Sequence, residues 1–122
     1  MIGMALEGLN VLEFGEFIPA PFCGTLLADL GADVIKVERV PEGDAARGFA
    51  PPLIDGESAA FMMMNRNKRG IAANLKAEAG KEIVDRLLKD ADIVIENYPK
   101  GTMERPGLGH ETLRDMNPGD RK

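Results

Sequence analysis

Residues 21–39 read PFCGTLLADLGADVIKVER. The part up to Leu30 has the pattern of a helix, and Gly31 suits the left-handed residue that closes one. Residues 33–38 contain Val34, Ile35 and Val37, which are typical of a buried strand, and Arg39 follows directly. The stretch therefore reads as a helix, a tight turn and a strand that ends on a cation. An α/β sheet can present a phosphate-binding group in this way.

The alternation of helices and strands continues on both sides of this stretch. It predicts strands at 10–14, 33–38, 71–75 and 92–97, and helices at 20–30, 59–64, 77–91 and 110–116. The interval 41–58 is rich in Pro and Gly, which predicts a long surface excursion. The fold class that follows is α/β: a Rossmann-like, mainly parallel sheet with flanking helices. Because four strands are few for this architecture, we expect it to be incomplete without a C-terminal part or a partner.

Composition limits the class of protein. The chain has 122 residues, 44% of them apolar and 29% charged, which fits one globular domain. A formal net charge of -5 argues against nucleic acid or an anionic membrane as a partner. No apolar run approaches the roughly 20 residues of a membrane span, and a basic, then apolar secretory signal is missing at the start. With Cys23 as the single cysteine, we expect a cytoplasmic protein without a disulfide or a metal.

Candidate ligand-binding residues follow the predicted strands. Ligands of parallel sheets bind beyond the carboxyl ends of the strands, and these ends carry the loop 15–19, Arg39, Lys76, Asn97 and Tyr98. Two cations, an amide, an aromatic ring and a helix N-terminus suit a ligand with phosphates and a flat heterocycle. The alternative is that Arg39 and Lys76 are merely solvated charges at strand ends.

A dinucleotide site is the obvious rival interpretation, because Glu38 ends the second strand where such folds place a ribose-binding acid. The loop after the first strand argues against it. It reads GEFIPAP over 15–21 and lacks the Gly-x-Gly-x-x-Gly fingerprint. Pro19 and Pro21 also remove backbone donors that a pyrophosphate would use.

Five blocks of sequence, taken in order, resemble the N-terminal part of class III CoA-transferases. This family includes formyl-CoA and carnitine CoA-transferases and α-methylacyl-CoA racemase. The similarity extends from about Leu6 to Pro118 and implies a CoA-binding Rossmann-like domain at 1–118, followed by a polar tail at 119–122. The blocks are LEGLNVLEF (6–14), LADLGADVIKVER (27–39), NRNKR (65–69), ADIVIENY (91–98) and GLG (107–109).

The resemblance also implies which residues bind CoA. Arg39 matches the arginine at the nucleotide, and Arg105 matches a further CoA-contacting arginine. Relatives similar to formyl-CoA transferase have histidine and glutamine where this chain has Glu16 and Ile18, so formate or oxalate specificity does not carry over. The implied CoA-binding residues are Ile18, Pro19, Arg39, Ala73, Asn74, Leu75, Lys76, Asn97, Tyr98 and Arg105.

The function implied by the resemblance is transfer of CoA from a CoA thioester to a carboxylic acid. In the family a nucleophilic aspartate forms a mixed anhydride and then an enzyme thioester, and it follows the segment matched by Asn117 and Pro118. Asp120 lies in a polar tail with nothing to position it, so we assign no catalytic residue and expect this chain alone to be inactive. Two alternatives stay open: a racemase fragment, or a non-catalytic truncated paralogue that acts as an assembly module. Because relatives form interlocked dimers, we expect a homodimer.

Overall fold

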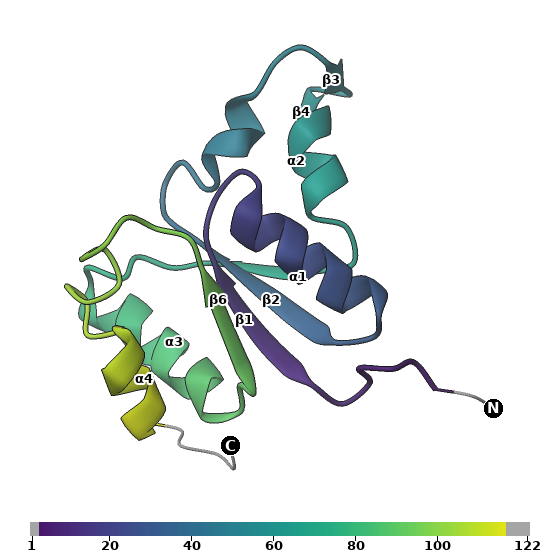
Figure 1. Cartoon of the computed structure of the whole chain (residues 1–122). Helices are drawn as coiled ribbons and strands as arrows, with labels where there is room; N and C mark the ends of the chain where they lie inside the picture. The colour runs from purple at the N-terminus through teal and green to yellow at the C-terminus, as the bar shows by residue number, and fades with distance from the viewer. Residues whose placement is uncertain (1–2, 117–122) are drawn as a thin grey trace.

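The computed structural model describes residues 3–116, in which a parallel sheet lies between two layers of helices (Figure 1). Helix α1 (Pro19–Asp29) covers one face. Helices α3 (Glu78–Lys89) and α4 (His110–Met116) pack on the other. The predicted Rossmann-like architecture is confirmed. In the order β5-β2-β1-β6, all neighbours parallel, the strands are β5 (Arg69–Ala72), β2 (Asp33–Glu38), β1 (Asn10–Phe14) and β6 (Ile93–Glu96).

Successive residues of β1 supply the cores on the two faces. Val11 packs with Ala28 on the α1 side. Leu12 and Phe14 belong to the core that contains Val84 of α3. Adjacent side chains of a strand point to opposite faces, so a strand covered on both sides is apolar almost throughout. The short apolar runs that predicted the strands are therefore a consequence of double burial.

The ends of the helices follow local sequence signals. Pro19 begins α1, where a missing N–H costs no helical hydrogen bond. After α1, Gly31 adopts φ +106°, which a side chain would strain. Helix α2 (Ala59–Met64) begins after Ser58, whose hydroxyl accepts a hydrogen bond of 3.3 Å from the Phe61 amide.

The third predicted strand was misplaced. It was expected at 71–75, but β5 runs from Arg69 to Ala72. The chain leaves the sheet because Asn74 forms a turn: its Oδ1 accepts a hydrogen bond of 3.0 Å from the Lys76 amide. This edge strand is also largely exposed, so it lacks the apolar run that identified the buried strands.

The predicted excursion at 41–58 contains little regular structure, as expected. It holds a 3-10 turn (Ala45–Gly48) and a small hairpin of β3 (Leu53–Ile54) and β4 (Glu57–Ser58), followed by α2. The predicted polar tail at 119–122, with Asp120, lies outside the described residues.

Four charged side chains lie buried on the α1 side of the sheet. We call Glu13, Lys36, Asp44 and Lys68 the buried charge cluster. The Lys36 ammonium lies 2.9 Å from both carboxylates, and the Lys68 ammonium lies 2.6 Å from Glu13. None of the four side chains is more than 3% exposed. The cluster joins β1 and β2 to the segment between β2 and β5, which supplies Asp44 and Lys68.

Candidate functional site

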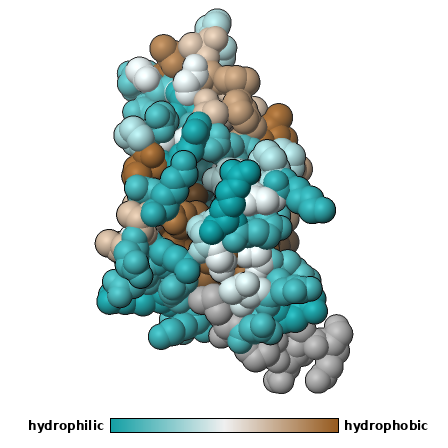
Figure 2. Space-filling model, turned by 90° about the vertical axis from the view of Figure 1, so that its left-hand side faces the viewer, coloured by the Kyte–Doolittle hydropathy of each residue, from teal (hydrophilic) through white to brown (hydrophobic). Residues whose placement is uncertain are grey.

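A cavity of about 970 Å³ opens at the edge of the sheet where β1, β2 and β5 end. Its walls also include the start of α3 and the segment after β6. Figure 2 looks onto this side of the molecule and shows apolar surface in a hollow between hydrophilic side chains. Of the apolar residues that line the cavity, Phe14, Val37 and Met103 are buried at its base, at most 4% exposed, whereas Val40 is 41% exposed. An apolar floor with charged walls suits a ligand that has both a hydrophobic and an ionic part.

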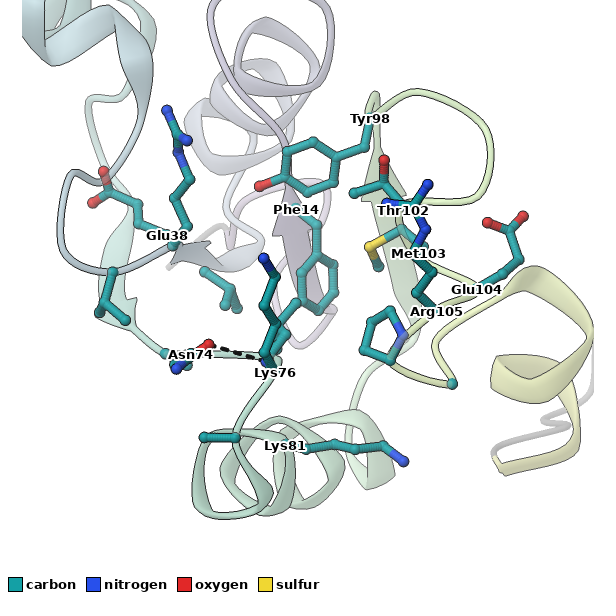
Figure 3. A pocket seen from close by; sticks show the side chains of 18 of the residues that line it. Phe14, Glu38, Asn74, Lys76, Lys81, Tyr98, Thr102, Met103, Glu104 and Arg105 are labelled. Atoms are coloured by element: carbon teal, nitrogen blue, oxygen red, sulfur yellow. Dashed lines mark hydrogen bonds between the residues drawn. The ribbon is translucent and has the colours of Figure 1, made fainter.

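Several charged side chains line this cavity from different segments. Lys76 extends into it beside Phe14, and Arg105 lies on the opposite wall (Figure 3). The predicted residues that line it are Arg39, Ala73, Asn74, Leu75, Lys76, Tyr98 and Arg105. These come from three separate parts of the chain, so the structure brings together residues far apart in the sequence.

The remaining predicted residues lie elsewhere. Pro19 and Asn97 line an adjoining cavity of about 380 Å³ that shares Arg39 and Tyr98 with the larger one. Ile18 lines neither cavity and is 60% exposed. After β1, therefore, Pro19 borders the smaller cavity, whereas the preceding Ile18 faces solvent.

Arg39 stands at the junction of the two cavities. Its Nε lies 2.9 Å from a Glu16 carboxylate oxygen and donates a hydrogen bond of 3.0 Å to the Gly43 carbonyl. About half of the Arg39 side chain is exposed (52%), whereas Glu16 is 18% exposed. The guanidinium is thus held by its Nε at a cavity wall.

Asn97 holds the loop after β1 in place. Its Oδ1 accepts a hydrogen bond of 3.1 Å from the Glu16 amide, and its Nδ2 donates one of 3.0 Å to the Glu16 carbonyl. This pair of bonds joins the end of β6 to the loop that borders both cavities. The sequence predicted Asn97 as a ligand contact, and in the structure both polar atoms of its side chain are bonded to the Glu16 backbone.

The wall formed by residues 73–77 rests directly on α3. A Cβ on Gly80 would meet the Asn74 carbonyl oxygen and lie 2.8 Å from the Asn74 carbonyl carbon. Only a glycine permits this approach, because real Cβ atoms keep a distance of more than about 3 Å from backbone atoms. Gly80 therefore sets the position of the loop that carries Lys76.

The carboxylate of Glu38 already accepts hydrogen bonds from other residues of the protein. Arg47 donates to both of its carboxylate oxygens at 2.7 and 2.8 Å, and the Asp44 amide donates at 2.8 Å. The Arg47 hydrogen bond is the main reason that the pKa of Glu38 lies below its ordinary value. With its oxygens engaged in this way, Glu38 is poorly placed to bind a ribose hydroxyl, which agrees with the missing dinucleotide fingerprint.

Tyr98 faces the cavity as a neutral phenol. Burial raises its pKa to about 12, and the negative charge of Glu16 acts in the same direction. At neutral pH its hydroxyl can therefore donate or accept a hydrogen bond. Beside Phe14 it also offers an aromatic ring to a flat ligand (Figure 3).

Sequence reasoning missed some lining residues. Lys81 lines the cavity from near the start of α3, and its closeness in sequence to a predicted strand end was a usable signal. Thr102 and Met103 line the cavity from an irregular turn, for which no sequence pattern pointed to the site. Between residues 3 and 116 no group of three or more His, Cys, Asp or Glu side chains could hold a metal ion. The same part of the chain contains no helix long and apolar enough to cross a membrane.

The fold and the cavity define a Rossmann-like α/β domain with a large cavity, lined by polar and apolar residues, at the carboxyl edge of its sheet. A family model described as CoA-transferase family III matches residues 6–119. The chain belongs to this family, as its sequence blocks predicted.

Individual proteins that are similar in sequence or structure are consistent with this family assignment. A succinyl-CoA–D-citramalate CoA-transferase from Chloroflexus aurantiacus is 43% identical over 93% of this chain and 28% of its own length. A succinyl-CoA:glutarate CoA-transferase from Mus musculus is 42% identical over 93% of this chain and 26% of its own. A crystal structure of a CaiB/BaiF family protein from Brucella suis superposes with a TM-score of 0.86 at 45% identity, covering 95% of this chain and 32% of that one. The chain thus spans about 30% of the length of such relatives.

Proposed function

We propose that this chain is the N-terminal CoA-binding portion of a class III CoA-transferase, and that CoA binds in the 970 Å³ cavity. The observation that carries the proposal is the convergence of Arg39, Lys76 and Arg105 around an apolar floor. Cations recognise phosphates, and the ring of Tyr98 can contact the adenine. The proposed ligand set is the one that the family resemblance implied, with Ile18 the least supported member because it is exposed outside both cavities.

We also propose the chemistry of a whole transferase containing this domain. It would move CoA from a CoA thioester to a carboxylic acid through an aspartyl intermediate. No residue between 3 and 116 is assigned as that nucleophile, so the domain would bind CoA without turning it over. The relatives from Chloroflexus aurantiacus and Mus musculus are named CoA-transferases. No observation here favours the racemase alternative.

CoA is expected to raise the melting temperature of the 122-residue chain. At a CoA concentration about tenfold above its Kd, binding stabilises the fold by about 1.4 kcal/mol. Arg39→Ala should weaken binding by about tenfold to a hundredfold, because charged hydrogen bonds contribute about 1.5–3 kcal/mol. At the same CoA concentration, the rise in melting temperature should then largely disappear in the variant. Scanning fluorimetry measures the melting temperature, and calorimetric titration measures the Kd.

The matched control is Arg86→Ala, which removes an exposed arginine of α3 outside the cavity and should leave the CoA shift unchanged. NAD serves as a second ligand control and should give no shift. Absence of a shift with millimolar CoA in the unchanged chain would sink the proposal.

A second candidate function, an assembly module, is favoured by one surface feature. Along the outer side of α1 and its two flanking residues, apolar side chains recur at every fourth position, and each is about half exposed: Ile18, Phe22, Leu26 and Leu30. We call these residues the α1 stripe. Exposed apolar patches of this kind mark association surfaces. We propose that the chain forms a cytoplasmic homodimer through this stripe.

Leu26→Glu is expected to convert that dimer into a monomer, since a charge in the middle of an apolar interface is costly to bury. Light scattering after size-exclusion chromatography measures the change. Ile83→Glu is the matched control, because Ile83 is also about half exposed (41%) but lies on α3. A monomeric wild-type chain, or equal behaviour of the two variants, would refute a dimer through the α1 stripe.

A further inference from the structure

Glu16 connects four segments of the candidate site. Its carboxylate pairs with Arg39 at 2.9 Å and accepts a hydrogen bond of 3.0 Å from the Ala45 amide. Its backbone amide and carbonyl are both bonded to the side chain of Asn97. A residue fixed at its backbone and at both carboxylate oxygens has little freedom to move. Glu16 also lines both cavities, where it stands next to the guanidinium.

We infer that Glu16 is a positioning residue that orients Arg39 for a phosphate of CoA. This inference deepens the proposed function and rests on it. The contacts found for the Arg39 guanidinium among the described residues go through Nε, to Glu16 and to the Gly43 carbonyl. An arginine tethered at Nε keeps its two terminal nitrogens for a ligand, and these form the fork that matches a phosphate.

The physical benefit is preorganisation. A free arginine side chain loses rotamer freedom when it binds, which costs about 0.5–1.5 kcal/mol for each immobilised long side chain. The contact with Glu16 restricts Arg39, which is otherwise half exposed, before CoA arrives. The negative charge of Glu16 opposes an incoming phosphate. Its oxygens, however, are already engaged by Arg39 and the Ala45 amide, so we infer that the orienting effect outweighs the repulsion.

The test is a double-mutant cycle on CoA affinity, measured by calorimetric titration of the 122-residue chain. Glu16→Ala should weaken CoA binding by about three- to tenfold, which corresponds to the rotamer cost returned to Arg39. In the Arg39→Ala background the same change should alter the Kd by less than about twofold, because the residue that Glu16 orients is gone. Glu16→Gln, which keeps one acceptor oxygen, should recover part of the loss.

The outcomes separate this inference from the CoA site itself. If the unchanged chain does not bind CoA, the proposed function fails. If it binds CoA but Glu16→Ala is neutral or binds more tightly, Glu16 is a repelling charge and the inference is overturned. Equal losses with and without Arg39 would also overturn it, since they would show a general structural role. Glu82→Ala, an exposed acid of α3 outside both cavities, is the control for unspecific charge effects.

Discussion

Lys36→Met is expected to lower the free energy of unfolding by about 3–5 kcal/mol, the usual cost of removing one member of a buried ion pair. Lys36 is 3% exposed at its side chain and contacts Glu13 and Asp44, both at 2.9 Å. Methionine fills a similar volume but leaves the buried charge cluster with an excess negative charge. Because a domain of this size is stable by only about 5–15 kcal/mol, this loss is a large fraction of the total stability. Urea unfolding followed by circular dichroism measures the difference.

Two further measurements show whether the uncompensated charge is the cause. Adding Asp44→Asn to Lys36→Met should recover a substantial part of the loss. An asparagine oxygen still accepts from the Phe17 and Ala46 amides, as Asp44 Oδ1 does at 3.1 and 2.8 Å. Lys100→Met, at an exposed position, should change stability by less than about 0.5 kcal/mol. If Lys36→Met costs no more than this control, the cluster does not stabilise the fold.

The loss of unfolding free energy in Lys36→Met should become smaller as the pH falls. Burial acts to raise the pKa of Asp44, but the paired Lys36 ammonium and the bonded amides outweigh it and bring the pKa below its ordinary value of 3.8. A carboxylate with a lowered folded-state pKa stabilises the fold above its unfolded pKa, and this contribution is lost as the pH falls through the folded value. The difference between the wild type and Lys36→Met should therefore be largest near neutral pH and shrink below about pH 4.

The layout of the sheet could be predicted because buried strands produce apolar runs. The bounds expected for β1 and β2 match the structure, and α2 begins and ends where predicted. The edge strand β5 was displaced because exposed residues carry no such pattern. The convergence of Arg39 and Lys76 at one cavity followed from topology alone, since parallel strands end at the same edge.

The buried charge cluster was not predicted, although the sequence held a signal for it. Glu13 and Lys36 are each flanked by apolar residues in a strand, and the two strands pair so that these residues are opposite each other. Opposite charges at matched positions of adjacent buried strands indicate an ion pair. Lys68 and Asp44 could not be found in this way, because irregular segments bring them to the cluster and their place depends on tertiary contacts.

Gly80→Ala is expected to destabilise the fold by about 1–3 kcal/mol, the cost of forcing an extra methyl group into a packed site. The new Cβ would collide with the carbonyl of Asn74, which is backbone and cannot rotate away. Helix propensity alone predicts the opposite sign, because alanine is favoured over glycine in a helix by about 1 kcal/mol. The sign of the measured change therefore decides whether close packing against residues 73–77 or helix propensity dominates at this position.

The control is Ala79→Gly at the preceding, exposed position of α3, which should cost about 1 kcal/mol through propensity alone. If Gly80→Ala stabilises the chain by a similar amount, α3 does not pack against Asn74 as described.

The collision of the new Cβ with Asn74 should also affect CoA binding. Residues 74–76 form a wall of the 970 Å³ cavity, and moving them displaces Lys76. Gly80→Ala should thus weaken CoA binding by more than Ala79→Gly does, at a temperature where both variants are folded. Equal affinities would show that the loop moves without disturbing the cavity, which would separate the packing of α3 from the binding of CoA.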